Sequence, residues 1–180
     1  MKMEPQKIAE TKQKLRDSFF ELYAAKRIEK IGIKEITDRA GFNRGTFYIH
    51  YKDIYDLLEQ TEEELLQVIS MFADNIMDAV FHTGDIHAAL PPEEFFQYYG
   101  KYMKVLIGPN GDISFMARLR SLVKDLFTKE IQKLDFKKIH IEKAEYVFEY
   151  VSSAQIGILT YWFQNDMKMP LTMLADIIQT

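Results

Sequence analysis

The sequence predicts an all-α protein in which a small helix-turn-helix domain precedes a larger helical body. Apolar residues recur at helical spacing along most of the 180-residue chain, and no segment shows the alternation typical of a strand. Residues 33–58 also contain two short helical patterns around a glycine, followed by a much longer one. A hydrophobic content of 47% is sufficient for a packed core, so this length fits one small and one larger domain.

The first two helices are indicated by apolar stripes and by a glycine that ends the second one. We expect the first helix over about residues 7–27 and the second near 34–40. Gly41 breaks the second helix. The apolar positions of these two helices are Ile8, Leu15, Phe19, Leu22, Tyr23, Ile33, Ile36 and Ala40.

A third helix of about residues 44–50 is too short and too polar to be explained by its own packing. Asn43 is its expected N-cap, because an Asn side-chain oxygen accepts a hydrogen bond from a free backbone N–H at a helix start. Phe47 and Tyr51, four residues apart, are expected to anchor it to the domain. The remaining side chains can donate hydrogen bonds to phosphates or base edges, which indicates duplex DNA as a partner. They are Arg44, Thr46, Tyr48 and His50.

The fourth helix is long enough to connect two domains. Its apolar stripe begins at Ile54 and continues to about residue 81. We therefore place the helix-turn-helix domain at residues 1–52 and a helical body at residues 53–180, linked by this helix from about residue 53.

Proline and glycine signals divide the rest of the body into further helices. One helix opens after Pro92, and another follows the turn at 108–111 and continues to about residue 134. A long helix covers about 141–165, and a short one starts after Pro170. The helix of 141–165 is apolar on two faces, so we expect it to be buried on both sides, either within its own domain or between subunits. One face holds Ala144, Val147, Phe148, Val151, Ile158 and Trp162, and the other holds Tyr146, Tyr150, Ser153, Gly157 and Tyr161.

Charge is distributed unevenly along the chain. Residues 1–52 hold 12 Lys and Arg against 7 Asp and Glu, a balance of +5, while residues 53–180 hold 11 against 20, a balance of −9. A basic domain can neutralise phosphates while an acidic body is repelled from them. With no cysteine, no signal-peptide pattern and no apolar run long enough for a membrane, the sequence predicts a cytoplasmic protein.

No set of catalytic residues is evident in the sequence, and we predict neither an enzyme nor a bound cofactor. A Gly-rich phosphate loop, a nucleophile elbow and a Cys–His pair are all missing. His82 and His87 lie on either side of Asp85, but they flank a glycine turn and do not share one helical face. We therefore expect exposed turn histidines and no metal site.

The segment around the third helix resembles the DNA-binding domain of the tetracycline-repressor (TetR) family of bacterial regulators. The matching residues are Ile36, then Ala40-Gly41-Phe42-Asn43-Arg44-Gly45-Thr46-Phe47-Tyr48-Ile49-His50-Tyr51, and finally Leu57-Leu58. Two positions depart from the family pattern. Gly32 replaces the usual capping Thr as a weaker cap, and Ile54 replaces a usual Lys, whose phosphate contact is lost unless Lys52 supplies it. The resemblance is close over the first third of the chain and extends to the rest mainly in length and helix pattern.

This resemblance implies a sequence-specific transcriptional repressor whose homodimer binds a near-palindromic operator and is released by an effector. The body then serves effector binding and dimerisation, with the helix of about 141–165 and the final helix at the dimer interface. A swing of the fourth helix changes the separation of the two DNA-binding domains. Arg44 is the expected base-reading residue, while Thr46, Tyr48, His50 and Lys52 are expected at phosphates. The predicted DNA-binding set is Lys34, Thr37, Asn43, Arg44, Gly45, Thr46, Tyr48, His50 and Lys52.

Control by a partner protein is the alternative to a small effector. The C-terminal half is similar to a subgroup of these regulators that includes activators of dihydroxyacetone-kinase operons, which a partner protein controls. Methionine and aromatic residues are abundant in the body, and they fit equally a plain core and the lining of a ligand cavity. The sequence leaves the ligand-binding residues, the effector, the operator and the sign of regulation open.

Overall fold

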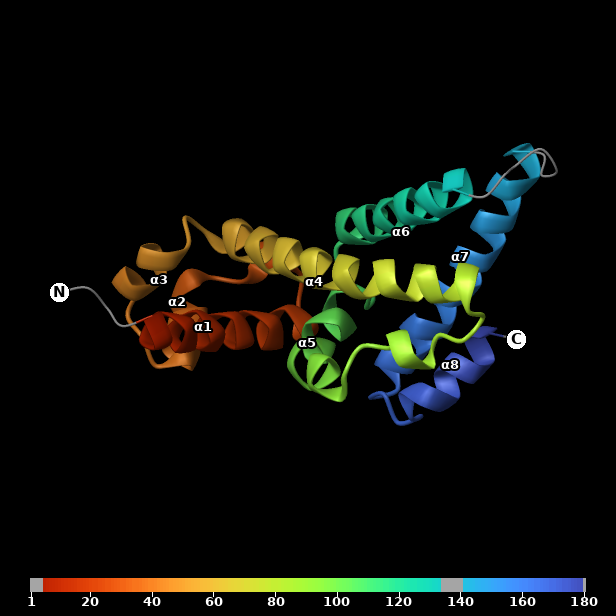
Figure 1. The fold of residues 1–180 in the computed structure, drawn as a ribbon. Coiled ribbons are helices and arrows are strands. Elements are labelled where there is room, and N and C mark those ends of the chain that lie inside the picture. The colour runs from red at the N-terminus through yellow and green to blue at the C-terminus, as the bar shows by residue number, and fades with distance from the viewer. Residues whose placement is uncertain (1–4, 134–140, 180) are drawn as a thin grey trace. The chain divides into compact units, whose positions relative to one another are not determined.

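The described part of the chain is entirely helical. The computed structural model describes residues 5–133 and 141–179, and no strand occurs among them (Figure 1), which confirms the predicted all-α class. Within these residues, no helix is both long and apolar enough to cross a membrane.

The chain divides into two compact units. One comprises residues 1–64 with 109–111, which we call the head, and the other comprises residues 65–108 with 112–180, which we call the body. The division falls inside α4 (Ile54–His82), so this helix begins in the head and continues into the body. The predicted boundary after residue 52 lies ahead of this helix.

The head is built from the predicted helices, and α3 has the predicted bounds. Its elements are α1 (Pro5–Ala25), η1 (Ile28–Lys30), α2 (Ile33–Ala40), α3 (Arg44–His50) and the first part of α4. The α1 helix starts and ends about two residues earlier than expected. Gly32 is the N-cap of α2, as predicted, and its carbonyl oxygen accepts hydrogen bonds from the N–H groups of Glu35 and Ile36.

The core of the head joins side chains from every one of its α-helices. Five of these side chains are fully buried: Leu15, Phe19, Ile36, Phe47 and Leu57. Burial of side chains of this size is the main stabilising contribution in a small domain. A polar contact adds to it at the edge of the core, where the Arg16 guanidinium pairs with both carboxylate oxygens of Glu64 at 3.2 and 2.6 Å. The core therefore holds α1, α2, α3 and the start of α4 as one unit.

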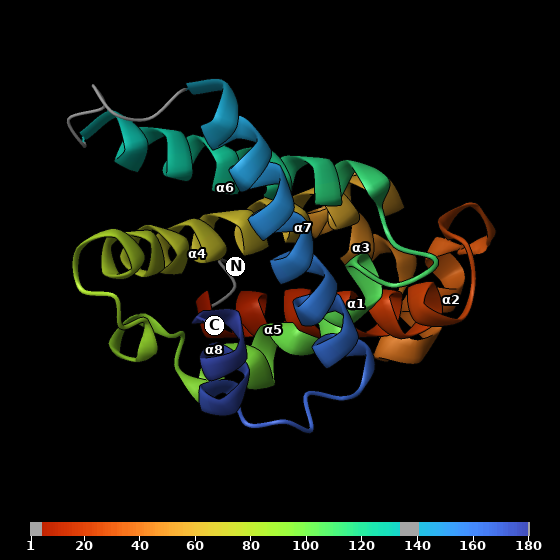
Figure 2. The same ribbon diagram turned by 90° about the vertical axis from the view of Figure 1, so that its right-hand side faces the viewer.

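The helices of the body also follow the sequence prediction closely. They are the second part of α4, η2 (His87–Ala89), α5 (Glu93–Leu106), α6 (Ile113–Lys133), α7 (Ile141–Gln164) and α8 (Leu171–Gln179). Figure 2 shows α7 running from the end of α6 toward α5 and α8. Aromatic contacts fix this arrangement, because the Phe127 and Phe148 rings lie 5.0 Å apart between α6 and α7. The Phe96 and Trp162 rings lie 5.2 Å apart between α5 and α7.

The segment between α7 and α8 is tied to the helices around it. Asp166 and Met167 have φ values of 57° and 52°, in the left-handed region that side chains rarely adopt. The Lys104 ammonium of α5 pairs with the Asp166 carboxylate at 2.5 Å. The Trp162 indole N–H donates to the Met169 carbonyl at 2.7 Å. These contacts hold the turn that brings α8 back to the body, where Leu174 and Ala175 are buried.

Candidate nucleic-acid interface

The turn between α2 and α3 has the geometry of a helix-turn-helix. Gly41 has a φ of 76°, a left-handed conformation that glycine adopts without a steric penalty. The Gly41 N–H donates to the Asp38 carbonyl at 3.4 Å, and the Phe42 N–H donates to the Thr37 carbonyl at 2.8 Å. This is the Schellman arrangement, which satisfies carbonyls that the end of a helix leaves free. Only residues 41–43 then separate the two helices, as in DNA-binding motifs of this type.

Asn43 caps α3, as the sequence predicted. Its side-chain Oδ1 accepts a hydrogen bond from the Thr46 N–H at 2.9 Å, while its own backbone is extended. Gly45 explains part of this geometry, because a Cβ at that position would lie 3.1 Å from Asn43 Oδ1. The glycine therefore leaves room for the capping side chain, and α3 starts at Arg44.

The inner face of α3 is an aromatic anchor, also as predicted. Phe47 is 0% exposed and Tyr51 is 2% exposed, with their ring centroids 5.5 Å apart. The Lys12 ammonium lies 5.4 Å from the Tyr51 ring centroid, a distance that suits a cation–π contact. Burial raises the pKa of Tyr51 to about 12, so the hydroxyl stays protonated at neutral pH. The anchor leaves the opposite face of α3 uncovered.

The outer face of α3 presents large side chains to solvent. Arg44 is exposed and has no ion-pair partner among the described residues, while Tyr48 is 58% and Ile49 68% exposed. Sequence reasoning missed Ile49. Helical geometry could have identified it, because it follows Phe47 by two residues and so lies about 200° around the helix from that buried side chain. An exposed guanidinium and an exposed β-branched side chain suit base edges, where an apolar group can contact the thymine methyl.

Three further residues of the predicted DNA-binding set lie in different surroundings. Lys52 is exposed, and its backbone N–H donates to Asp56 Oδ2 at 2.7 Å. Lys34 is exposed but its ammonium pairs with the Asp38 carboxylate at 2.5 Å. Thr37 is 1% exposed, and its hydroxyl donates to the Lys34 carbonyl at 3.1 Å. This burial does not fit the direct DNA contact predicted for Thr37, which instead belongs to the packed face of α2.

His50 is half-buried at the end of α3. Burial, and secondarily the positive charge of Lys12, lower the pKa of His50 below its ordinary value. Its Nε2 atom is enclosed and makes no hydrogen bond with a described residue. His50 is therefore neutral near pH 7, so any contact with a phosphate is a neutral hydrogen bond and not an ion pair.

Charge pairing occupies several cations of the head but leaves Arg44 and Lys52 without an acidic partner among the described residues. Several cations of the head are matched by acidic neighbours: Lys26 by Glu35 at 2.6 Å, Arg39 by Glu21 at 2.7 Å and Lys34 by Asp38. Arg44 and Lys52 form no ion pair with any residue that the structure describes. Their charges therefore remain for a partner that carries phosphates.

The histidine pair considered from the sequence does not come together. The His87 Nε2 lies 3.0 Å from the Asp176 carboxylate of α8, whereas the His82 Nε2 lies near Asp78 and Glu130. Each histidine thus has its own acidic neighbours, and Asp85 instead accepts the His87 backbone N–H at 2.9 Å.

Comparison with known proteins adds evidence from a different part of the chain. Residues 93–180, just under half of the chain, match the TetR_C_8 family, described as a transcriptional regulator C-terminal region. This match supports a TetR-type transcriptional regulator. The narrower similarity to dihydroxyacetone-kinase operon regulators is not confirmed by it. No curated protein matches the chain.

Proposed function

We propose that this chain is a TetR-type transcriptional regulator that binds duplex DNA through α3. The main observation behind the proposal is that this short helix has one buried face and one exposed face. Phe47 and Tyr51 fix it to the head, while Arg44, Tyr48 and Ile49 are left exposed. A seven-residue helix with such large exposed side chains contributes more to recognition than to packing. The regulator-like C-terminal region supports the same function independently.

In the proposed complex, α3 enters the major groove of one half of the operator. Arg44, at the first position of the helix, binds the O6 and N7 atoms of a guanine, and Ile49 contacts a thymine methyl group. Tyr48 and Lys52 bind the phosphate backbone and set the register. Asn43, Gly45 and Thr46 act mainly by fixing the start of α3, since the Asn43 side chain is occupied by the Thr46 N–H.

A homodimer is the proposed active form, and α7 provides its interface. The face predicted to be the second apolar stripe is exposed in the single chain, with Tyr146 at 81%, Tyr150 at 78% and Tyr161 at 71%. Val147 and Val151, which the sequence placed on the other stripe, are exposed as well. An added Cβ at Gly157 would have no atom within 4 Å, so another helix has room there. Exposed apolar area of this kind marks protein interfaces.

Regulation is proposed to act through α4. This helix is continuous from the head into the body, so a change in the body alters the placement of the heads of a dimer. We propose that an effector releases the operator in this way and that the protein is a repressor. A partner protein acting on the body is the alternative.

The experiment that tests the proposal is selection of duplexes from a random library by the full chain. A dimer with two α3 helices should enrich a near-palindromic sequence whose half-sites are about one helical turn apart. Affinity for the selected duplex should exceed that for its scrambled version by at least about 1,000-fold at physiological salt. A library that shows no enrichment, with equal binding of all sequences, would contradict sequence-specific recognition.

A further inference from the structure

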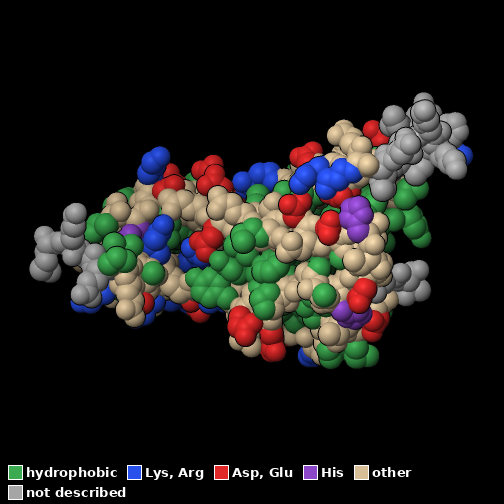
Figure 3. Space-filling model, in the orientation of Figure 1, with side chains coloured by type: hydrophobic (Ala, Val, Ile, Leu, Met, Phe, Trp, Pro, Cys, Tyr) green, Lys and Arg blue, Asp and Glu red, His purple; other side chains and the backbone are tan. Residues whose placement is uncertain are grey.

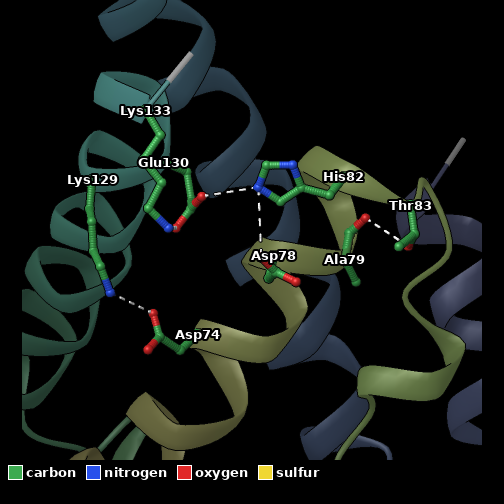
Figure 4. A network of polar contacts seen from close by, with 8 residues as sticks. All are labelled: Asp74, Asp78, Ala79, His82, Thr83, Lys129, Glu130 and Lys133. Carbon is green, nitrogen blue, oxygen red and sulfur yellow. Dashed lines mark hydrogen bonds and ion pairs between the residues drawn. The ribbon is translucent and has the colours of Figure 1, made fainter.

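The body contains a cluster of potential metal ligands that the proposed function does not use. Asp78 and His82 lie one turn apart on α4, and Glu130 comes from α6 (Figure 4). Figure 3 shows acidic, basic and histidine side chains together on the face of the body over these helices. Residues four apart share one face of a helix, so the sequence places the first two donors side by side. The packing of α6 near α4 places the third donor, Glu130, close to them.

The distances within the cluster are longer than hydrogen bonds but suit a metal ion. The His82 Nε2 lies 3.6 Å from Asp78 Oδ1 and 3.5 Å from Glu130 Oε2. The donor atoms of the three residues all lie within 4.8 Å of one another. Donors at about 2.0–2.2 Å from a tetrahedral zinc ion are about 3.3–3.6 Å apart. The two measured separations are therefore close to the edge lengths of such a tetrahedron. A small rotation of the exposed Asp78 side chain can bring the third separation, between Asp78 and Glu130, to a similar length.

Glu130 gives independent evidence for a ligand. Its side chain is only 4% exposed, and Oε1 accepts from the Lys133 ammonium at 2.5 Å. The other oxygen, Oε2, is buried and has no hydrogen-bond partner among the described residues, although it points toward His82. An anionic oxygen withdrawn from water without a hydrogen bond is unfavourable. A cation bound between Oε2 and the imidazole would satisfy it.

We propose that Asp78, His82 and Glu130 form a binding site for a divalent transition-metal ion, best matched by Zn²⁺. One imidazole and two carboxylates favour zinc and similar ions over Ca²⁺ and Mg²⁺, which prefer oxygen ligands alone. The two carboxylates balance the charge of the ion, and Lys133 holds the second Glu130 oxygen as an outer contact that orients the ligand. Three protein ligands leave one position for water or an exogenous group. The bound ion joins α4 to α6.

Zinc titration of the tag-free, chelator-stripped full chain tests the proposal. Competition against a chromophoric chelator should show one Zn²⁺ per chain, and Co²⁺ should give the intense visible absorption of a tetrahedral site. His82→Gln and Glu130→Gln should each weaken binding by more than about tenfold. His87→Gln is the matched control, because His87 also contacts a carboxylate of the body but lacks the second one. It should bind as the wild type does.

Several results would overturn the site. They are no Zn²⁺ binding by the wild type, equal binding by wild type and His82→Gln, or an equal loss in His87→Gln. Circular dichroism without metal checks that each variant is folded. Asp78→Asn provides a further test with little risk to folding, because the Asp78 side chain is 66% exposed. It should also weaken binding, and unchanged affinity in this variant would remove Asp78 from the site.

Discussion

Among the individual residues of α3 and its ends, the contacts of each side chain indicate its main role. Asn43 starts the helix, Phe47 and Tyr51 hold it, and Arg44 and Ile49 face outward. Because the capping and anchoring residues are already occupied within the head, substitutions can separate effects on helix stability from effects on DNA contact.

Replacing Asn43 with Ala should destabilise the start of α3 by about 1 kcal/mol, because the Thr46 N–H loses its acceptor. Hydrogen exchange of the α3 amides, measured by mass spectrometry, should become correspondingly faster. Asn43→Asp is the control, since it retains the accepting oxygen and should leave exchange nearly unchanged. Equal exchange in Asn43→Ala and wild type would show that the cap does not stabilise α3.

Lys52 should contribute to DNA affinity in a sequence-independent way. Lys52→Ala should weaken binding to operator and scrambled duplex alike, and should reduce the slope of log K against log salt by about one unit. Anisotropy titrations at several salt concentrations measure this slope. Lys124→Ala, which removes an exposed charge from α6 of the body, should leave it unchanged. If Lys52→Ala changed the ratio of the affinities for operator and scrambled duplex, Lys52 would contact bases and not only phosphates.

His50 should make the stability of the head depend on pH. Its pKa is lowered in the folded chain, so the unfolded chain binds a proton first as the pH falls. The contribution of neutral His50 is complete above the unfolded pKa of about 6.5 and is lost as the pH falls through the folded value. The urea midpoint should therefore drop less between about pH 7 and pH 5 in His50→Gln than in wild type. Identical pH profiles for His50→Gln and wild type would contradict this role.

At the level of secondary structure, the two long helices α4 and α7 have different roles. The α4 helix continues from head to body, and α7 buries Phe148 and Trp162 on one side while exposing Tyr146, Tyr150 and Tyr161 on the other. A helix with two apolar faces and only one of them covered in the single chain needs a partner for the second. In our proposal that partner is the α7 helix of a second copy.

Gly157→Glu should disrupt the dimer, because it introduces a bulky charge at the centre of the exposed α7 face. Sedimentation velocity should show monomer or aggregate, and operator binding should fall with it, since two heads are needed for tight binding. Ser121→Glu, on an exposed position of α6, is the control. An unchanged dimer in Gly157→Glu would exclude this face as the interface.

Much of the helical pattern could be predicted from the sequence, because it depends on local spacing and caps. The bounds of α3 follow from Asn43 and Tyr51, and those of α2 from Gly32 and Gly41. Contacts between distant helices could not be predicted in this way. The approach of Glu130 to His82 depends on how α6 packs on α4, and the burial of Thr37 depends on which face of α2 meets the core.

At the scale of the whole molecule, two separate segments support the proposed function. The helix-turn-helix lies within residues 33–50, whereas the similarity to transcriptional regulators covers residues 93–180. The basic balance of residues 1–52 and the acidic balance of residues 53–180 agree with a head that approaches DNA and a body that does not. The proposed metal site lies in the body, and its test does not depend on DNA binding.

The proposed reading of DNA sequence by α3 can be tested by measuring how tightly Arg44→Ala binds DNA. The measurement compares wild type and Arg44→Ala on the selected operator and on a scrambled duplex at one salt concentration. We predict a loss of about 1–3 kcal/mol on the operator, a much smaller loss on the scrambled duplex, and a flattened preference at one base pair. An equal loss on both duplexes would make Arg44 a phosphate contact, and unchanged affinity for both would contradict the placement of α3 in the groove.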